Sequence, residues 1–199
     1  MKEYMRLESD SIGTMEVPED AYYGVQALRA KENFPITGTK LHPVFIKNLA
    51  KIKRAAAITN RKAGRLKPEI ANAIEASANE VICGMFDKDF IVDGIQGGAG
   101  TSANMNMNEV IANRAIEMLC GKKGDYTIVH PNDHVNMAQS TNDVIPTAGK
   151  LTVLDLLKPL DKSLSLLTDA LYDKAAAFDH IVKIGRTQLE DAVPMRLGQ

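Results

Sequence analysis

Three short segments of the sequence combine glycine with small side chains that carry a hydroxyl or an amide group. They are residues 97–109 (GGAGTSANMNMNE), residues 130–143 (HPNDHVNMAQSTND) and residues 185–188 (GRTQ). Such side chains donate hydrogen bonds without adding a large charge. Donors aimed at one point can bind a carboxylate and stabilise negative charge that develops on it during a reaction. The three segments are therefore the candidates for chemistry.

The first segment is a glycine-rich loop that leads into a predicted helix. Unpaired N–H groups and the dipole at a helix N-terminus favour an anion, and glycine lets the main chain approach it closely. We expect a carboxylate, because the Gly-Lys-Ser/Thr sequence of a phosphate loop does not occur in the segment. The alternative is that Thr101, Ser102 and Asn104 only cap the helix.

Residues 98–103 also match the loose dinucleotide-binding pattern G-x-G-x-x-A. That fold requires a full strand before the glycines and an acidic residue about 20 positions later, at the end of a second strand. Only residues 90–92 could form the first strand, and Asp125 precedes the apolar pair Ile128-Val129 instead of following it. The context therefore disfavours a dinucleotide site.

His130 and His134 have the four-residue spacing of two metal ligands on one helix face. Pro131 favours a turn or a first helical turn instead, and the sequence places no third ligand. We expect a solvated or hydrogen-bonded pair and no metal. The other segments also have simpler alternatives: Ser140, Thr141 and Asn142 could only cap the helix that follows, and Arg186 could be an ion-pair partner.

The elements that must position these segments are mainly helical. A small β element is predicted near the N-terminus, where Met5 and Leu7 alternate with Arg6 and Glu8. Apolar residues then recur at three- and four-residue steps, which predicts helices over about 43–64, 68–84 and 104–121, and a long helix from about 143, with a kink at Pro159.

The long helix carries an apolar stripe that needs partner helices, as in a helical bundle. The stripe consists of Leu151, Leu154, Leu157, Leu160, Leu164, Leu167, Leu171 and Phe178. We therefore expect a mainly α protein with two parts. Residues 1–139 would form an N-terminal helical domain with a small β-hairpin, and residues 140–199 the start of a central bundle that stops early, because the chain ends just after a new apolar segment begins.

Composition limits the function classes. The 199 residues carry 24 Lys+Arg and 25 Asp+Glu, are 45% hydrophobic and only 5% aromatic, and include no Trp. Without a basic block or stacking platforms we expect no nucleic-acid partner. Without an apolar stretch of about 20 residues or a secretory signal we expect no membrane partner and a cytoplasmic location. Cys83 and Cys120 are predicted to be reduced, buried thiols.

Taken together, the segments resemble the aspartase/fumarase superfamily over almost the whole chain. VPEDAYYGVQ (17–26), NFPI (33–36), the segment 97–109, HPNDHVN (130–136), STND (140–143) and GRT (185–187) stand in the order and spacing of that family. Within it, QGGAGTS (96–102) and GRTQLEDAVP (185–194) are most similar to the aspartate ammonia-lyases. Gln188 stands where fumarate hydratases usually have histidine.

The resemblance implies reversible β-elimination of ammonia from L-aspartate to give fumarate, through an enediolate and with no cofactor or metal. By similarity, Thr101, Ser140 and Thr141 would surround the β-carboxylate. Asn142 would hold the amino group, and Thr187 with Gln188 would meet the α-carboxylate. The family works as a homotetramer whose active sites are shared between subunits.

The family's catalytic serine lies in a mobile Gly-Ser-Ser loop, and no such sequence occurs in residues 1–199. We therefore expect these residues to be a lyase fragment that has no catalytic base and is inactive alone. The alternatives are a fumarate hydratase-like or other lyase of the superfamily, or a non-catalytic helical assembly or ligand-binding module.

Overall fold

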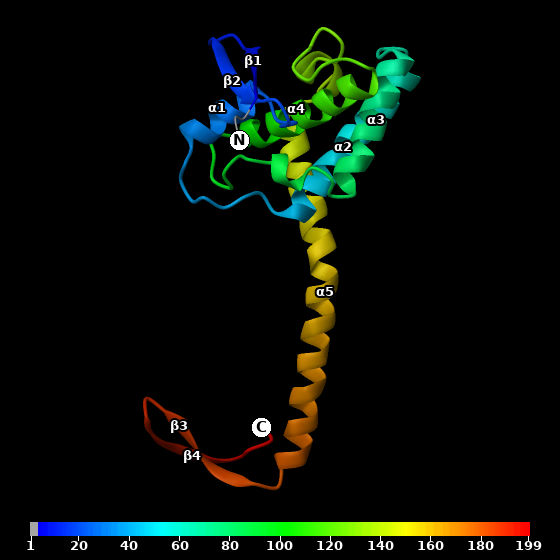
Figure 1. Ribbon diagram of the computed structural model, residues 1–199. Coiled ribbons are helices and arrows are strands. Elements are labelled where there is room, and N and C mark those ends of the chain that lie inside the picture. Colours follow the sequence, from blue (N-terminus) through cyan, green and yellow to red (C-terminus); the bar gives the residue numbers. More distant parts are fainter. Residues whose placement is uncertain (1–3) are drawn as a thin grey trace. The chain divides into compact units, whose positions relative to one another are not determined.

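The computed structural model describes residues 4–199 and is mainly helical, as predicted. The elements are, in order, β1 (Met5–Ser9), β2 (Thr14–Pro18), α1 (Val25–Asn33), α2 (Pro43–Lys62), α3 (Pro68–Ile82), the short 3-10 helix η1 (Asp87–Asp89), α4 (Thr101–Met118), the single π-helical turn η2 (Pro131–Val135), α5 (Thr141–Phe178), β3 (Val182–Thr187) and β4 (Glu190–Arg196) (Figure 1). Within residues 4–199, no helix combines the length and the apolar character that crossing a bilayer requires.

The chain divides into two compact units, of which the first ends at Thr152 and the second is Val153–Gln199. The first unit therefore includes the first turns of α5. This division by contacts does not test the predicted boundary between the N-terminal domain and the central bundle at residues 139 and 140. That boundary stays a prediction.

The core of the first unit lies among α2, α3 and α4, and α2 and α3 run side by side (Figure 1). Apolar residues at helical spacing, such as Leu49, Ile74 and Ile111, are fully buried there. α4 is buried on almost every side from Ala103 to Asn113, although it carries several asparagines. Polar side chains on a helix buried all round need partners inside the protein. Asn106 donates to the Asp89 carbonyl and Asn113 to the Tyr22 carbonyl, so these two side chains connect α4 to other segments.

The N-terminal hairpin forms as the alternating pattern predicts, with β1 antiparallel to β2. Its charged side is the buried one: Arg6 and Glu8 form an ion pair at 2.8 Å, whereas Leu7 is exposed. The Arg6 guanidinium also donates to the carbonyls of Pro18 and Ala21. The alternation of apolar and charged residues in β1 gives the strand two different faces. The hydrogen bonds of Arg6 decide that the charged face turns inward.

The structure corrects the expectation for the cysteines, because both Cys83 and Cys120 are exposed. Each lies where a helix ends: Cys83 follows α3 directly, and Cys120 comes two residues after α4 with a positive φ of 60°. Neither position is on the apolar stripe of its helix, so the small hydrophobic side chain is left at the surface.

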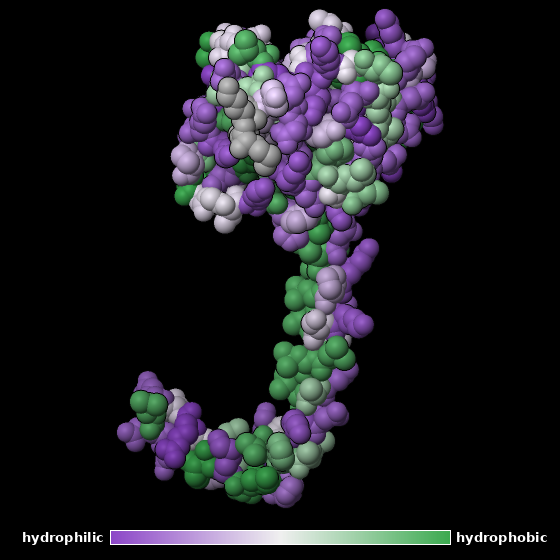
Figure 2. All heavy atoms as spheres, viewed as in Figure 1, coloured by the Kyte–Doolittle hydropathy of each residue, from purple (hydrophilic) through white to green (hydrophobic). Residues whose placement is uncertain are grey.

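The second unit contains the rest of α5 and an antiparallel hairpin of β3 and β4. Except for Leu151, the predicted apolar stripe lies on this part of α5; Leu154 and Leu167, for example, are 58% and 56% exposed. Figure 2 shows hydrophobic residues on one side of the helix and hydrophilic residues on the other. α5 continues through Pro159.

Candidate active site

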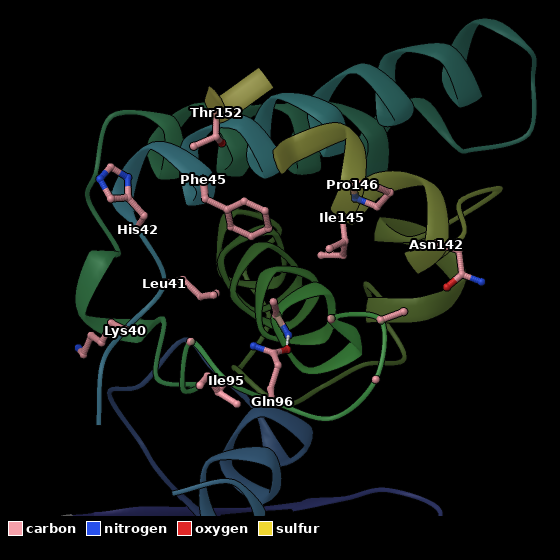
Figure 3. A pocket seen from close by; sticks show the side chains of 15 residues that line it. Lys40, Leu41, His42, Phe45, Ile95, Gln96, Asn142, Ile145, Pro146 and Thr152 are labelled. Atoms are coloured by element: carbon pink, nitrogen blue, oxygen red, sulfur yellow. Dashed lines mark hydrogen bonds between the residues drawn. The ribbon is translucent and has the colours of Figure 1, made fainter. Parts of the chain in front are cut away.

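The glycine-rich loop leads directly into α4, which begins at Thr101, three residues earlier than predicted. Gly100 caps the helix with a φ of 84°, and a Cβ at this position would lie 2.9 Å from Cγ2 of Ile145. Both the positive φ and the close approach of α5 therefore require glycine. The Gln96 amide shapes the same loop, since its oxygen accepts from the Ala103 N–H at 2.6 Å (Figure 3). Its nitrogen donates to the Asp93 carbonyl at 2.9 Å.

Asp93 anchors the loop from the other side. Its carboxylate accepts from the Thr37 hydroxyl at 2.6 Å and from the N–H groups of Thr37, Gly38 and Ile95 at 2.7–2.8 Å. These donors, led by the Thr37 hydroxyl, hold the pKa of Asp93 well below its ordinary value. The carboxylate is thus ionised and structural, and it fixes where the loop begins.

The second segment ends in residues 140–142, at the start of α5. The Ser140 hydroxyl oxygen accepts from the Asn142 N–H at 3.2 Å, and the Ser140 carbonyl accepts from the N–H groups of Asp143 and Val144. Ser140 therefore does cap the helix, as the simpler alternative proposed. Capping leaves these residues accessible to a ligand, because the Ser140 and Asn142 side chains remain exposed.

Asn104 joins the first two segments. Its side chain is buried, and its Nδ2 donates both to Thr141 Oγ1 and to Asn136 Oδ1, each at 3.1 Å. Its Oδ1 is buried without a partner among the described residues. Four of the predicted substrate-binding residues, Thr101, Ser140, Thr141 and Asn142, therefore belong to two segments that one buried amide holds together.

A cavity of about 960 Å³ lies beside this junction. Asn142 and Ile145 of α5, residues 98–100 of the glycine-rich loop, and Phe45 of α2 line it, and Phe45 and Ile145 face its interior (Figure 3). Most of its lining is apolar, which suits a dicarboxylate poorly. We therefore take the polar junction at Asn104, and not the centre of this cavity, as the candidate site.

Thr187 and Gln188 lie in the second unit, at the turn between β3 and β4. Gln188 and Leu189 both have positive φ angles, 53° and 65°, and they form the two-residue loop between the paired residues Thr187 and Glu190. Hairpins of this type normally use Asn-Gly or Gly-Gly there. A strained glutamine at this turn is a reason to suspect function. Arg186 does form the ion pair of the simpler alternative, with Asp191 at 2.8 Å.

The histidine pair is structural, as expected. His130 Nδ1 accepts from the N–H groups of Asn132 and Asp133 and so caps η2, and His134 Nδ1 accepts from the His130 N–H at 2.9 Å. Within the part of the chain that the structure describes, no three His, Cys, Asp or Glu side chains are grouped so that they could hold a metal ion.

Sequence reasoning missed Lys53. This side chain is completely buried in α2, and its Nζ donates to Asn136 Oδ1 at 2.7 Å. Burial lowers the pKa of the amine to about 7. The signal was present in the sequence: Lys53 is four residues from both Leu49 and Ala57, on the apolar face of the helix.

A family model described as Lyase matches residues 13–199. The chain belongs to this lyase family. It is 53% identical over 198 residues to an aspartate ammonia-lyase from Bacillus subtilis, and 54% identical over 200 residues to a class II fumarate hydratase from Halobacterium salinarum. Each match covers 100% of this chain and 42% of the relative. The chain therefore spans less than half the length of these curated relatives.

The fold is similar to that of a solved fumarate lyase:delta crystallin from Brucella melitensis. The TM-score is 0.90 and the identity 48%, over 98% of this chain and 46% of that one. The lyase family and the mainly helical fold, both expected from the sequence, are confirmed. The relatives include both aspartate ammonia-lyases and a fumarate hydratase, two kinds of enzyme that differ in the reaction.

Proposed function

We propose that the protein containing these residues is an aspartate ammonia-lyase, which converts L-aspartate to fumarate and ammonia by β-elimination. The observation that carries the proposal is the Asn104 amide, which joins the glycine-rich loop to residues 140–142. The joined segments supply neutral donors, which suit a reaction that builds negative charge on a carboxylate.

In this proposal each side chain acts by donating hydrogen bonds. Thr101, Ser140 and Thr141 surround the β-carboxylate, where removal of the neighbouring proton builds an enediolate, so their donors act where charge develops. Asn142 holds the amino group that leaves as ammonia. Thr187 and Gln188 bind the α-carboxylate and orient the substrate.

The proposed catalytic base is a serine outside residues 1–199, in a homotetramer whose subunits share each active site. These residues alone are therefore expected to show no turnover. A cytoplasmic location and the absence of a cofactor stay predictions.

A second candidate function is hydration of fumarate to malate, which is favoured by the 54% identity to a fumarate hydratase. Gln188 argues against it, because an amide cannot carry the positive charge that a histidine could supply at this position. The two functions differ in the substrate that the purified protein consumes.

The test is a parallel assay of the full-length protein with L-aspartate, L-malate and argininosuccinate, following fumarate. Thr101→Ala and Asn142→Ala should each lower the turnover of aspartate by about 10²–10³-fold, the usual effect of losing one donor to a developing oxyanion. Thr59→Ala, which removes an exposed hydroxyl on α2, is the matched control. Fumarate formed from malate but not from aspartate would overturn the proposal.

A further inference from the structure

Lys53 is a lysine whose side chain is completely buried in the first unit. Its Nζ makes one hydrogen bond, to Asn136 Oδ1, and the ion pairs of the described residues include none between Lys53 and a carboxylate. A buried amine without a partner charge is costly for the fold. Strongly perturbed ionisable groups cluster at functional sites.

The hydrogen bonds around Lys53 lead to the proposed substrate donors. Asn136 Oδ1 accepts from Lys53 Nζ at 2.7 Å and from Asn104 Nδ2 at 3.1 Å. Asn104 Nδ2 also donates to Thr141 Oγ1 at 3.1 Å. Three consecutive contacts thus connect the amine of α2 to the first residue of α5.

Lys53 also holds the backbone that precedes α5. Asn136 Nδ2 donates to the Gln139 carbonyl at 3.2 Å, and Gln139 is followed directly by Ser140. About two turns further along the same buried face of α2, Asn60 Nδ2 donates to the Met137 carbonyl at 3.0 Å. Two polar residues on the buried face of α2 therefore fix the loop that carries residues 140–142.

We propose that Lys53 is the positioning residue of this site: it holds Thr141 in place through Asn136 and Asn104, and it supplies the positive charge that a bound dicarboxylate needs. The inference rests on the proposed function for its ligand. In this inference Lys53 does not touch the substrate, and yet it sets the affinity of the site for the substrate.

Burial alone accounts for the lowered pKa of the Lys53 amine. Several charged or titratable side chains lie on the elements that pack against α2 or bond to it: Glu69, Glu75 and Glu80 on α3, Glu109, Arg114 and Glu117 on α4, His130, Asp133 and His134 at η2, and Asp143 and Lys150 on α5. Desolvation is nevertheless the cause of the lowered pKa of Lys53, which is about 7. The free site is thus poised between its charged and neutral forms near neutral pH.

A dianion bound near Thr141 favours the ammonium form, so binding takes up a proton at Lys53. Affinity for the dianion should then fall as the pH rises above about 7 and the amine of the free protein loses its proton. Unit charges separated by a few hydrogen bonds in a protein of effective dielectric constant near 20 change binding by about tenfold.

Fumarate is the probe, because its carboxyl groups titrate far below this range. Its dissociation constant is measured calorimetrically with the full-length protein between about pH 6 and about pH 9. The wild-type constant should rise by about tenfold across the range. In Lys53→Met it should be weak and independent of pH, and in Lys53→Arg, which stays charged, it should also be independent of pH. Lys62→Met, at the exposed end of the same helix, should behave as wild type.

A Lys53→Met variant that binds fumarate with wild-type affinity and pH dependence overturns the inference. If the wild-type protein binds no fumarate, it is the proposed function that fails. The positioning role is then decided by crystal structures of the full-length wild type and Lys53→Met: displaced Asn136 and Thr141 side chains support it, and unchanged ones overturn it.

Discussion

Replacing Lys53 by methionine should make the protein more stable while it weakens the site. The folded-state pKa of the amine is about 7, against 10.5 for an exposed lysine. The unfolded chain therefore binds the proton more tightly, and between these two values the free energy of unfolding rises with pH. Below about pH 7 Lys53 destabilises the fold by its full amount, and above about pH 10.5 it no longer does.

The size of the effect follows from the shift. At about 1.4 kcal/mol for each pKa unit, lowering the pKa from 10.5 to about 7 corresponds to about 5 kcal/mol at low pH. Methionine fills a similar volume and removes this cost. It also removes one hydrogen bond worth about 1 kcal/mol, although Asn136 Oδ1 keeps its bond from Asn104. We expect the variant to be more stable near pH 7 by about 2–4 kcal/mol.

Urea denaturation of wild type and Lys53→Met at a series of pH values between about 6 and about 10 measures this difference. The advantage of the variant should shrink steadily as the pH rises, because wild type gains stability over this range. Lys62→Met should track wild type throughout. A Lys53→Met protein that is less stable than wild type at pH 7, or a difference that does not change with pH, would refute the reasoning.

Three further predictions concern other features. Burial raises the pKa of Glu109 to about 7 from 4.5, so the folded state holds the proton more tightly than the unfolded chain. The free energy of unfolding should therefore fall by up to about 3 kcal/mol as the pH rises from 4.5 to 7. Denaturation curves of Glu109→Gln should lack this fall. Gly100→Ala should destabilise the protein by about 1–3 kcal/mol, because the residue has a positive φ and its new Cβ meets Ile145; Ile145→Ala should recover part of the loss in the same denaturation experiment. The exposed stripe on α5 should make residues 1–199 associate, and light scattering across a dilution series should show a lower mass for Leu160→Glu with Leu167→Glu.

Local patterns predicted most helices well. α2 begins at Pro43 and α3 at Pro68, as the proline positions indicated. α1 was not predicted. The reason lies at its start, because the N-cap residue is Gly24, which has no side chain to cap the helix. The Glu109 carboxylate instead accepts from the N–H groups of Gly24, Gln26 and Ala27. A cap that comes from α4 leaves no local signal.

The C-terminal segment shows the same limit. Its apolar residues indicated a new element, and the structure forms the hairpin of β3 and β4. The turn between them places Gln188 and Leu189 at positive φ, which neither residue type indicates.

The sequence by itself determined which residues repeat at helical spacing and which segments carry neutral donors, because periodicity and residue type are local properties. Only the tertiary structure decided that Asn104 joins two of these segments, that the charged side of β1 turns inward, and that Lys53 is buried and donates to Asn136. The physical reason is that a helix face is covered or exposed by elements distant in sequence. The pKa of a lysine on that face, and with it the charge of the site, depends on that cover.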